Sequence, residues 1–239
     1  MTGPGEPASF RLGYVPGVTP GKWARVWAER LPDVALELVT VPVAGAEQAV
    51  RSGAVDAGLV RLPIDRDGLH AIPLYTETTV VVVGKDHAAA AVDELTVDDL
   101  SDEIVLRPPD TALVWDGPAP GSAPVSEPAT TARAVELVAA GVGVLVVPQS
   151  LARLHHRRDL TYRPLVGGPE SSVVLTWPAA ETSDLMEQFI GIVRGRTVNS
   201  TRTPRLREGP PAPSTPRNTA PARRDGARRR PPRRGRPRC

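Results

Sequence analysis

The sequence predicts an α/β fold that begins as a parallel sheet and ends in a basic tail. Strand and helix patterns alternate from residue 10 to residue 62, which predicts a βαβαβ unit with parallel strands and right-handed crossovers. A long extended segment over residues 71–87 contains no helix pattern and predicts a chain that leaves this sheet and enters a second one. Because 41% of the 239 residues are hydrophobic, the chain can bury a substantial core.

The βαβαβ unit follows from the spacing of its apolar residues. Strands are predicted over residues 10–15, 33–41 and 55–62. The helix after the first strand has an apolar stripe of Trp23, Val26, Trp27 and Leu31, and the two tryptophans point either into the core or to a dimer face. Thr19 is the expected cap of this helix, with Pro20 at its first position. A short helix over residues 44–53 ends at Gly53.

The second half alternates less regularly. Thr96 and Asp99 stand three residues apart, as in a capping box, ahead of a strand over residues 103–107. The proline-rich residues 108–128 predict a loop. A helix over 129–141, capped by Thr130 or Thr131, then precedes a buried strand at 144–148 and a helical stretch at 149–157. The remaining expected elements are strands at 160–165 and 171–177 and an amphipathic helix at 182–195.

The stretch Gly141-Val142-Gly143 has the glycine spacing of a phosphate-binding loop but the wrong order of elements. A dinucleotide fingerprint needs a strand, then the glycines, then a helix whose N-terminus faces the pyrophosphate. Here the helix comes before the glycines. Gly141 is therefore interpreted as a helix C-terminal glycine.

Charge divides the chain into an acidic body and a basic tail. The last 41 residues hold 13 arginines and two acids, a net charge of +11, against +2 for the whole chain and hence −9 for residues 1–198. The tail has almost no aliphatic residues, so we expect it to be disordered. The only cysteine in the whole sequence is Cys239. With no secretory signal pattern and no apolar run long enough to span a bilayer, the expected location is the cytoplasm.

The order of these segments resembles the effector-binding domain of LysR-type transcriptional regulators. The matching stretches include FRLGYVPGVTP (10–20), DAGLVRLP (56–63), LYTETTVVVVGKDHAAA (74–90) and VELVAAGVGVLVVPQSLA (135–152). The resemblance covers roughly residues 10–196. It implies a two-lobed fold of the periplasmic-binding-protein type 2 class, with two crossover strands.

On that template, lobe I spans about 10–80 and 175–196, and lobe II spans about 83–170. Residues 1–9 and 197–239 are then a disordered N-terminus and the Arg/Pro-rich tail. Family members begin with a winged helix-turn-helix, whereas nine residues precede Phe10 here. We therefore expect the DNA-reading part to be absent, so that any regulation would act through the tail or a partner.

The resemblance also implies a cleft between the lobes that binds a small organic anion or an amino-acid-like effector. In the family, the loop after the first strand offers backbone N–H groups and a hydroxyl to carboxylates. Here that loop is Pro16, Gly17, Val18 and Thr19, where Thr19 supplies the hydroxyl and Gly17 stands where a second hydroxyl often lies. Helix N-termini attract anions, although Thr19 also fits a purely capping role.

Further candidates come from strand ends. Arg61 ends the third strand and can pair with a carboxylate, either of the ligand or of Asp56 or Asp65. Arg107 ends a lobe II strand and has the same two alternatives. The remaining candidate ligand contacts lie at helix and strand ends, at Thr130, Thr131, Pro148 and Gln149.

No residue pattern indicates an enzyme, a cofactor or a metal. His155 and His156 are adjacent, so they point apart on a helix, and no Ser-His-Asp set or acid/base pair stands out. The predicted function is a non-enzymatic effector sensor linked to transcription regulation, with a possible homodimer. The alternatives are a cytoplasmic solute-binding protein without regulatory output, or an enzyme on the same fold.

The tail adds a different alternative, a weak and sequence-independent contact with nucleic acid. Arginines neutralise phosphates, and such binding is sensitive to salt. The candidate contacts are Arg223, Arg224, Arg228, Arg229, Arg230, Arg233 and Arg234.

Overall fold

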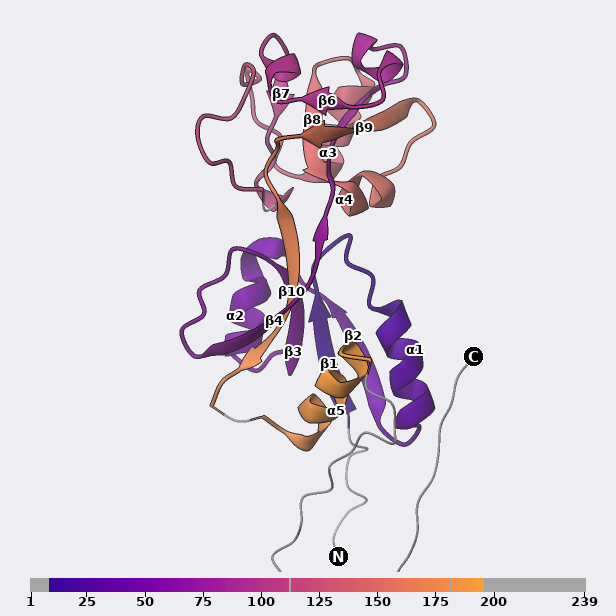
Figure 1. Cartoon of the computed structure of the whole chain (residues 1–239), viewed down its shortest axis with the longest axis vertical. Coiled ribbons are helices and arrows are strands. Elements are labelled where there is room, and N and C mark those ends of the chain that lie inside the picture. The colour runs from indigo at the N-terminus through magenta and orange to yellow at the C-terminus, as the bar shows by residue number, and fades with distance from the viewer. Residues whose placement is uncertain (1–8, 112, 181, 196–239) are drawn as a thin grey trace, which may run out of the picture. The chain divides into compact units, whose positions relative to one another are not determined.

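The computed structural model describes residues 9–111, 113–180 and 182–195. Two five-stranded mixed sheets form the framework (Figure 1), with strand orders β2-β1-β3-β10-β4 and β6-β9-β5-β8-β7. We call the part built on the first sheet lobe I and the part built on the second sheet lobe II. The two-lobed α/β fold expected from the sequence is confirmed.

Lobe I contains the predicted parallel unit. β1 pairs in parallel with both β2 and β3, whereas β10 is antiparallel to β3 and β4. Its elements are β1 (Ser9–Tyr14), α1 (Gly21–Arg30), β2 (Ala35–Thr40), the 3₁₀ helix η1 (Val43–Gly45), α2 (Ala46–Arg51), β3 (Ala57–Arg61), β4 (Leu69–Glu77), β10 (Ser171–Pro178) and α5 (Asp184–Val193).

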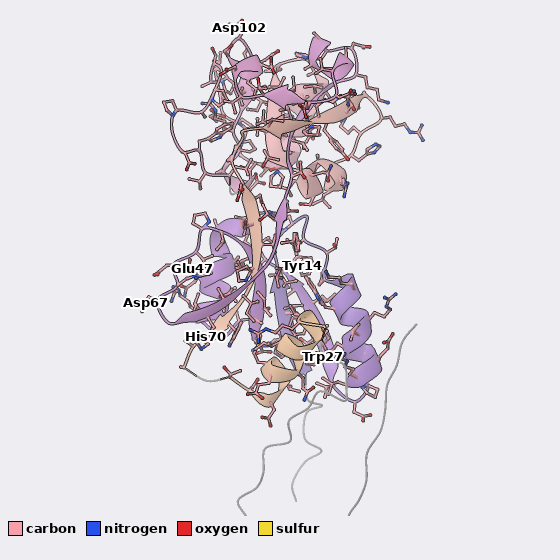
Figure 2. All side chains as sticks on the ribbon, in the orientation of Figure 1. Tyr14, Trp27, Glu47, Asp67, His70 and Asp102 are labelled. Atoms are coloured by element: carbon pink, nitrogen blue, oxygen red, sulfur yellow. The ribbon has the colours of Figure 1, made fainter. Side chains whose placement is uncertain are left out.

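The core of lobe I explains the tryptophans of α1. Phe10 stacks on Trp27 at 5.1 Å between ring centroids and on Phe189 of α5 at 5.5 Å. Trp27, labelled in Figure 2, is 1% exposed, and Trp23 is also buried. Burial of these large rings anchors α1 and α5 on the sheet, so the core interpretation of the tryptophans is confirmed and the dimer-face alternative is wrong.

Lobe II is built from β5 (Thr79–Gly84), η2 (Ala88–Ala91), β6 (Leu95–Thr96), η3 (Asp98–Leu100), β7 (Val105–Leu106), η4 (Pro109–Thr111), α3 (Thr131–Ala139), β8 (Val144–Pro148), α4 (Gln149–Leu154) and β9 (Leu160–Val166). Its sheet is covered on both faces. In β5, Val80 and Val82 pack with α3 and α4, whereas Val81 and Val83 pack with β6, η3 and β7. This alternation is the reason that a run of four valines forms a central strand.

The chain passes between the sheets twice. β4 ends at Glu77 and β5 begins at Thr79, so the extended segment predicted over 71–87 does leave one sheet for the other. The return runs from β9 to β10 through the turn at Gly167, whose φ of +73° suits glycine. Both passages of the chain between the sheets can be seen in Figure 1.

The Gly-x-Gly stretch is a helix end and not a phosphate loop. α3 ends at Ala139, Gly141 follows with a φ of +74°, and the N–H of Val142 donates to the carbonyl of Leu137. This is the left-handed C-terminal glycine arrangement that the order of elements predicts.

Candidate functional site

One edge of the lobe I sheet carries most of the lobe I candidates. β1, β3 and β4 all end at this edge, because β4 pairs antiparallel with β10, which pairs antiparallel with β3. The loop Pro16–Thr19 follows β1, Arg61 ends β3, and Glu77 ends β4. Carboxyl ends of strands in open α/β sheets are where ligands bind.

Arg61 is the most connected residue at this edge. Its side chain is fully buried and forms an ion pair with Glu77, with 2.9 Å between Nε and Oε2. Nη1 donates to the carbonyl of Pro16 at 2.8 Å, and Nη2 donates to Oγ of Ser150 on α4 at 2.9 Å. Arg61 therefore ties the loop after β1, the end of β4 and lobe II together.

The charge of Arg61 is neutralised inside the protein. The Glu77 side chain is 7% exposed and also accepts from the hydroxyl of Ser171 at 3.3 Å. Partial burial and the nearby Glu77 carboxylate raise the pKa of Tyr75, and Arg61 opposes this effect. A buried pair of this kind is costly to break, because removing one partner leaves the other charge unpaired.

Gly17 allows the close approach of this loop to lobe II. Its φ is +86°, and a Cβ at this position would lie 2.7 Å from Oγ of Ser150 and 3.0 Å from Nη2 of Arg61. Both the backbone conformation and the space require glycine. The hydroxyl of Ser150, which belongs to lobe II, thus lies close to position 17, where the family resemblance suggests a hydroxyl.

Thr19 does not cap α1. The helix begins at Gly21 with Pro20 in the cap position, and no side chain makes a capping hydrogen bond. The cap prediction is wrong, because the helix starts one residue later than expected and Pro20 takes the flanking position. The exposed Thr19 hydroxyl lies at the sheet edge described above.

The matching edge of lobe II carries the other candidates. β7 and β8 are parallel and end at Leu106 and Pro148, and Thr79 at the start of β5 pairs with Pro148. The N–H of Gln149 donates to the carbonyl of Thr78 at 2.9 Å, directly beside the passage between the sheets. Pro148 is buried and Gln149 is half-buried.

Arg107 differs from Arg61 in having no carboxylate on its guanidinium within the described chain. Nη2 donates to the carbonyls of Pro120 and Ala119 at 2.6 and 3.3 Å, and its backbone N–H donates to Glu127 at 3.3 Å. Nε is buried and makes no hydrogen bond to any described residue. A buried donor without an acceptor is rare and unfavourable, so an additional oxygen acceptor at Nε of Arg107 would stabilise the protein.

The start of α3 is already occupied by a carboxylate. Thr130 caps the helix, since its hydroxyl accepts from the N–H of Arg133 at 3.2 Å. Thr131 is buried, and both its N–H and its hydroxyl donate to Oδ1 of Asp110, at 2.8 and 2.7 Å. Asp110 lies in η4, inside the segment predicted to be a loop. The expected capping role of Thr130 is confirmed, and an internal anion holds the N–H group that a ligand would use.

The structure brings some candidates together and separates others. Pro16, Gly17 and Arg61 meet next to Ser150, which directly follows Gln149. Thr131 instead binds Asp110, and Thr130 caps α3. The expected pairing of Arg61 with Asp56 or Asp65 is wrong, because those carboxylates pair with Arg11 and Arg51.

Three polar residues at these edges were missed from the sequence: Glu77, Ser150 and Asp110. A charged residue at the end of a strand that passes from sheet to sheet was the available signal for Glu77. Ser150 could have been found as the second residue after a buried strand. No sequence signal identified Asp110, because its partner lies 21 residues away in a proline-rich segment.

Within the described ranges, no group of three His, Cys, Asp or Glu side chains is arranged to hold a metal ion. No helix in the same ranges is long and apolar enough to cross a membrane. The tail arginines predicted to contact nucleic acid, Arg223 to Arg234, lie outside the described residues.

Comparison with known proteins decides the family. The model of the LysR substrate binding domain matches residues 5–197. The chain belongs to this family. The transcriptional activator HcaR of Escherichia coli is 26% identical over 209 residues, which cover 82% of this chain and 70% of HcaR. A probable hydrogen peroxide-inducible genes activator of Mycobacterium avium is 30% identical over 163 residues, which cover 64% of this chain and 52% of the activator.

Solved structures show the same fold. The effector-binding domain of BenM with its effector benzoate has a TM-score of 0.64 at 22% identity, covering 84% of this chain and 98% of that domain. A hydrogen peroxide-bound cysteine-to-serine mutant of Corynebacterium glutamicum OxyR has a TM-score of 0.64 at 23% identity, covering 79% of this chain and 67% of OxyR. The chain is thus a LysR-type effector-binding domain, a sensor domain of a class linked to transcription regulation. The curated relatives are regulators rather than enzymes.

Proposed function

We propose that this domain senses a small organic anion held between the facing edges of the two sheets, without chemical turnover. The observation that carries the proposal is Arg107, a cation at the end of β7 whose buried Nε has no hydrogen-bond acceptor among the described residues. A ligand carboxylate would form the ion pair that no carboxylate among the described residues forms with this guanidinium.

The proposed contacts divide into ligand-binding and positioning residues. On lobe I the ligand meets Gly17 and Thr19, which precede α1. Val18 is a positioning residue, because its side chain is buried in the lobe I core and its N–H donates to the carbonyl of Val15 at 3.2 Å. On lobe II it meets Arg107, Thr130, Pro148 and Gln149. Pro16, Arg61 and Thr131 are positioning residues in this proposal, because their polar groups already bind Arg61, Glu77 and Asp110 respectively.

An organic anion fits this chain better than peroxide. Some relatives carry names that refer to hydrogen peroxide, and one OxyR neighbour holds it. Peroxide sensing by a protein usually relies on a reactive thiol. Residues 5–197 contain no cysteine, since the single cysteine is Cys239. The neighbour with bound benzoate is the more relevant precedent.

The signal passes to transcription, in this proposal, through a change in the relation of the two lobes. Arg61 already joins both lobes, so a ligand that binds both edges acts on the same connection. A ligand shifts such an equilibrium only by its difference in affinity for the two states. The cytoplasm, where DNA is accessible, is the proposed location.

A thermal-unfolding screen of the full chain against small carboxylates tests the proposal. Each carboxylate is paired with its neutral amide, for example benzoate with benzamide. A carboxylate at about 100 times its Kd should add roughly 2.7 kcal/mol, or about 5 to 11 °C in Tm. The matched amide and the Arg107→Gln variant should each lose most of this shift. A panel in which no carboxylate exceeds its amide would contradict the proposal.

Two copies of the domain are proposed to pair along lobe I. β2 is an edge strand of the first sheet, and Leu38 on it is 43% exposed. Exposed edge strands with apolar side chains favour association. Leu38→Glu should convert a dimer to a monomer in light-scattering measurements, and an unchanged mass would argue against this surface.

A further inference from the structure

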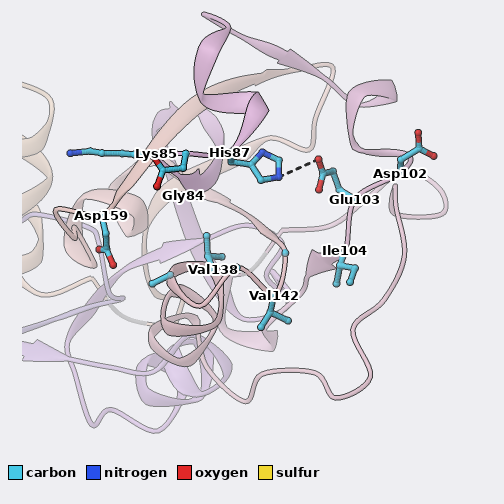
Figure 3. Close-up of a pocket in the computed structure, with 13 residues that line it drawn as sticks. Gly84, Lys85, His87, Asp102, Glu103, Ile104, Val138, Val142 and Asp159 are labelled. Atoms are coloured by element: carbon cyan, nitrogen blue, oxygen red, sulfur yellow. Dashed lines mark ion pairs between the residues drawn. The ribbon is translucent and has the colours of Figure 1, made fainter.

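Lobe II has a pocket at the end of its sheet opposite to Arg107 and Gln149. The pocket has a volume of about 560 Å³ and is lined by the turn after β5, the segment before β7, the C-terminal turn of α3, and Asp159 (Figure 3). β5 ends here at Gly84 and β8 begins here at Val144, whereas their other ends, Thr79 and Pro148, pair at the proposed effector edge. The pocket is therefore separate from the proposed effector site.

One wall of the pocket is apolar. Val138 of α3, Val142 of the following turn and Ile104 before β7 line it. Ile104 and Val142 are each 39% exposed, so together they present apolar surface on this wall. A ligand that covers them removes apolar surface from water, and this requires a ligand with an apolar body.

The other wall holds His87 and Glu103. Nδ1 of His87 accepts a hydrogen bond from the N–H of Ala89 at 3.2 Å, which places the proton of the neutral ring on Nε2. Nε2 lies 3.4 Å from Oε1 of Glu103, which is longer than an ordinary N–H···O hydrogen bond. Figure 3 shows the Glu103 carboxylate facing the histidine on this side of the pocket. Glu103 therefore keeps most of its capacity to accept from a ligand.

The lining carries an excess of negative charge. The lining holds four acids, Asp86, Asp102, Glu103 and Asp159, and one lysine, Lys85. Asp159 is paired with Arg157 at 2.9 Å, and in the described part of the chain none of the other three acids forms an ion pair with an arginine. The C-terminal end of α3 adds the negative pole of a helix dipole. Such a pocket repels the carboxylates that suit the other site and attracts cations.

We propose that this pocket is a second ligand site, which binds a small organic cation with an ammonium group on an apolar body. The ammonium group donates to the carboxylate of Glu103, and Asp102 adds negative charge at the rim. The apolar body lies against Val138, Val142 and Ile104. A bare metal ion would leave this apolar wall uncovered.

Benzylamine is the probe that tests the proposal, with benzyl alcohol as its neutral counterpart and benzoate as an anion. Two-dimensional amide NMR of the full chain should show shifts at Gly141, Val142 and Gly143 with benzylamine alone. Affinity should fall at least threefold in Glu103→Gln and stay unchanged in Glu136→Gln, an exposed carboxylate of α3 outside the pocket.

The unfolding temperature of Glu103→Gln verifies that the variant is folded, and Asp102→Asn, at an exposed position, replaces it if it is not. The absence of amide shifts at benzylamine concentrations up to about 10 mM would overturn the proposal. Equal binding of benzyl alcohol would overturn the role of the cation, as would affinity that is insensitive to both substitutions.

Discussion

The buried ion pair between Arg61 and Glu77 gives the sharpest prediction. In Glu77→Gln the shape is kept but the negative charge is removed, and Arg61, whose side chain is 0% exposed, loses its counter-ion. Breaking one partner of such a pair costs about 3 to 5 kcal/mol, because the remaining charge stays buried. For a folded body of this size, that corresponds to a fall in Tm of about 6 to 20 °C.

Thermal unfolding followed by circular dichroism measures this loss, with Glu136→Gln as the control. Glu136 pairs with Arg133 on the surface of α3, with both side chains more than half exposed, so its loss should be below about 1 kcal/mol. The double variant Arg61→Met with Glu77→Gln should lose less than the sum of the single variants, because no unpaired charge is then left. A loss below about 1 kcal/mol in Glu77→Gln would refute the reasoning.

Three further predictions concern local structure. Gly17→Ala should lower the free energy of unfolding by about 2 kcal/mol or more, since both the left-handed backbone and the close contact with lobe II oppose a Cβ. Thr130→Ala should cost about 1 kcal/mol through loss of a helix cap, whereas Thr19→Ala, which caps nothing, should stay within about 0.5 kcal/mol. The hydrogen bond from Arg157 holds the pKa of Asp159 below its usual range, so Arg157→Gln should raise that pKa in an NMR titration.

Each of these predictions has its own check. Gly53 has a φ of +71° and no neighbouring atom near the position that a Cβ would take, so Gly53→Ala measures the backbone penalty alone. Equal losses of unfolding free energy in Gly17→Ala and Gly53→Ala would show that the close contact at Gly17 adds no penalty. Chemical denaturation that ranks Thr19→Ala with Thr130→Ala would contradict the cap assignment. For Asp159 the folded pKa is lower than the unfolded one, so its stabilisation exists above the ordinary carboxyl pKa and is lost as pH falls through the folded value. An unchanged titration in Arg157→Gln would exclude this cause.

Much of the fold follows from local patterns. The strand-helix alternation before residue 62 and the valines of β5 have the periodicity of buried strands, so both sheets could be predicted. The C-terminal glycine of α3 was recognisable because a helix pattern precedes it. The lobe boundaries inferred from the family resemblance remain a prediction. The chain does pass from one sheet to the other at Thr78, and it returns between Val166 and Ser171.

The site was predictable in position more than in chemistry. Strand ends marked Arg61, Arg107 and Gln149, because carboxyl ends of parallel strands gather at one edge. Their partners were not predictable, since pairing depends on geometry between distant segments. Arg61 meets Ser150 across 89 positions, and nothing local to either residue encodes that contact.

The most direct test of the effector site is amide NMR of the full chain with the strongest carboxylate from the thermal screen. The account predicts that shifts appear together on both edges, around Thr19 on lobe I and around Arg107 and Gln149 on lobe II, and that Arg107→Gln abolishes them. Shifts confined to one lobe, or shifts that persist unchanged in Arg107→Gln, would contradict binding between the two sheets.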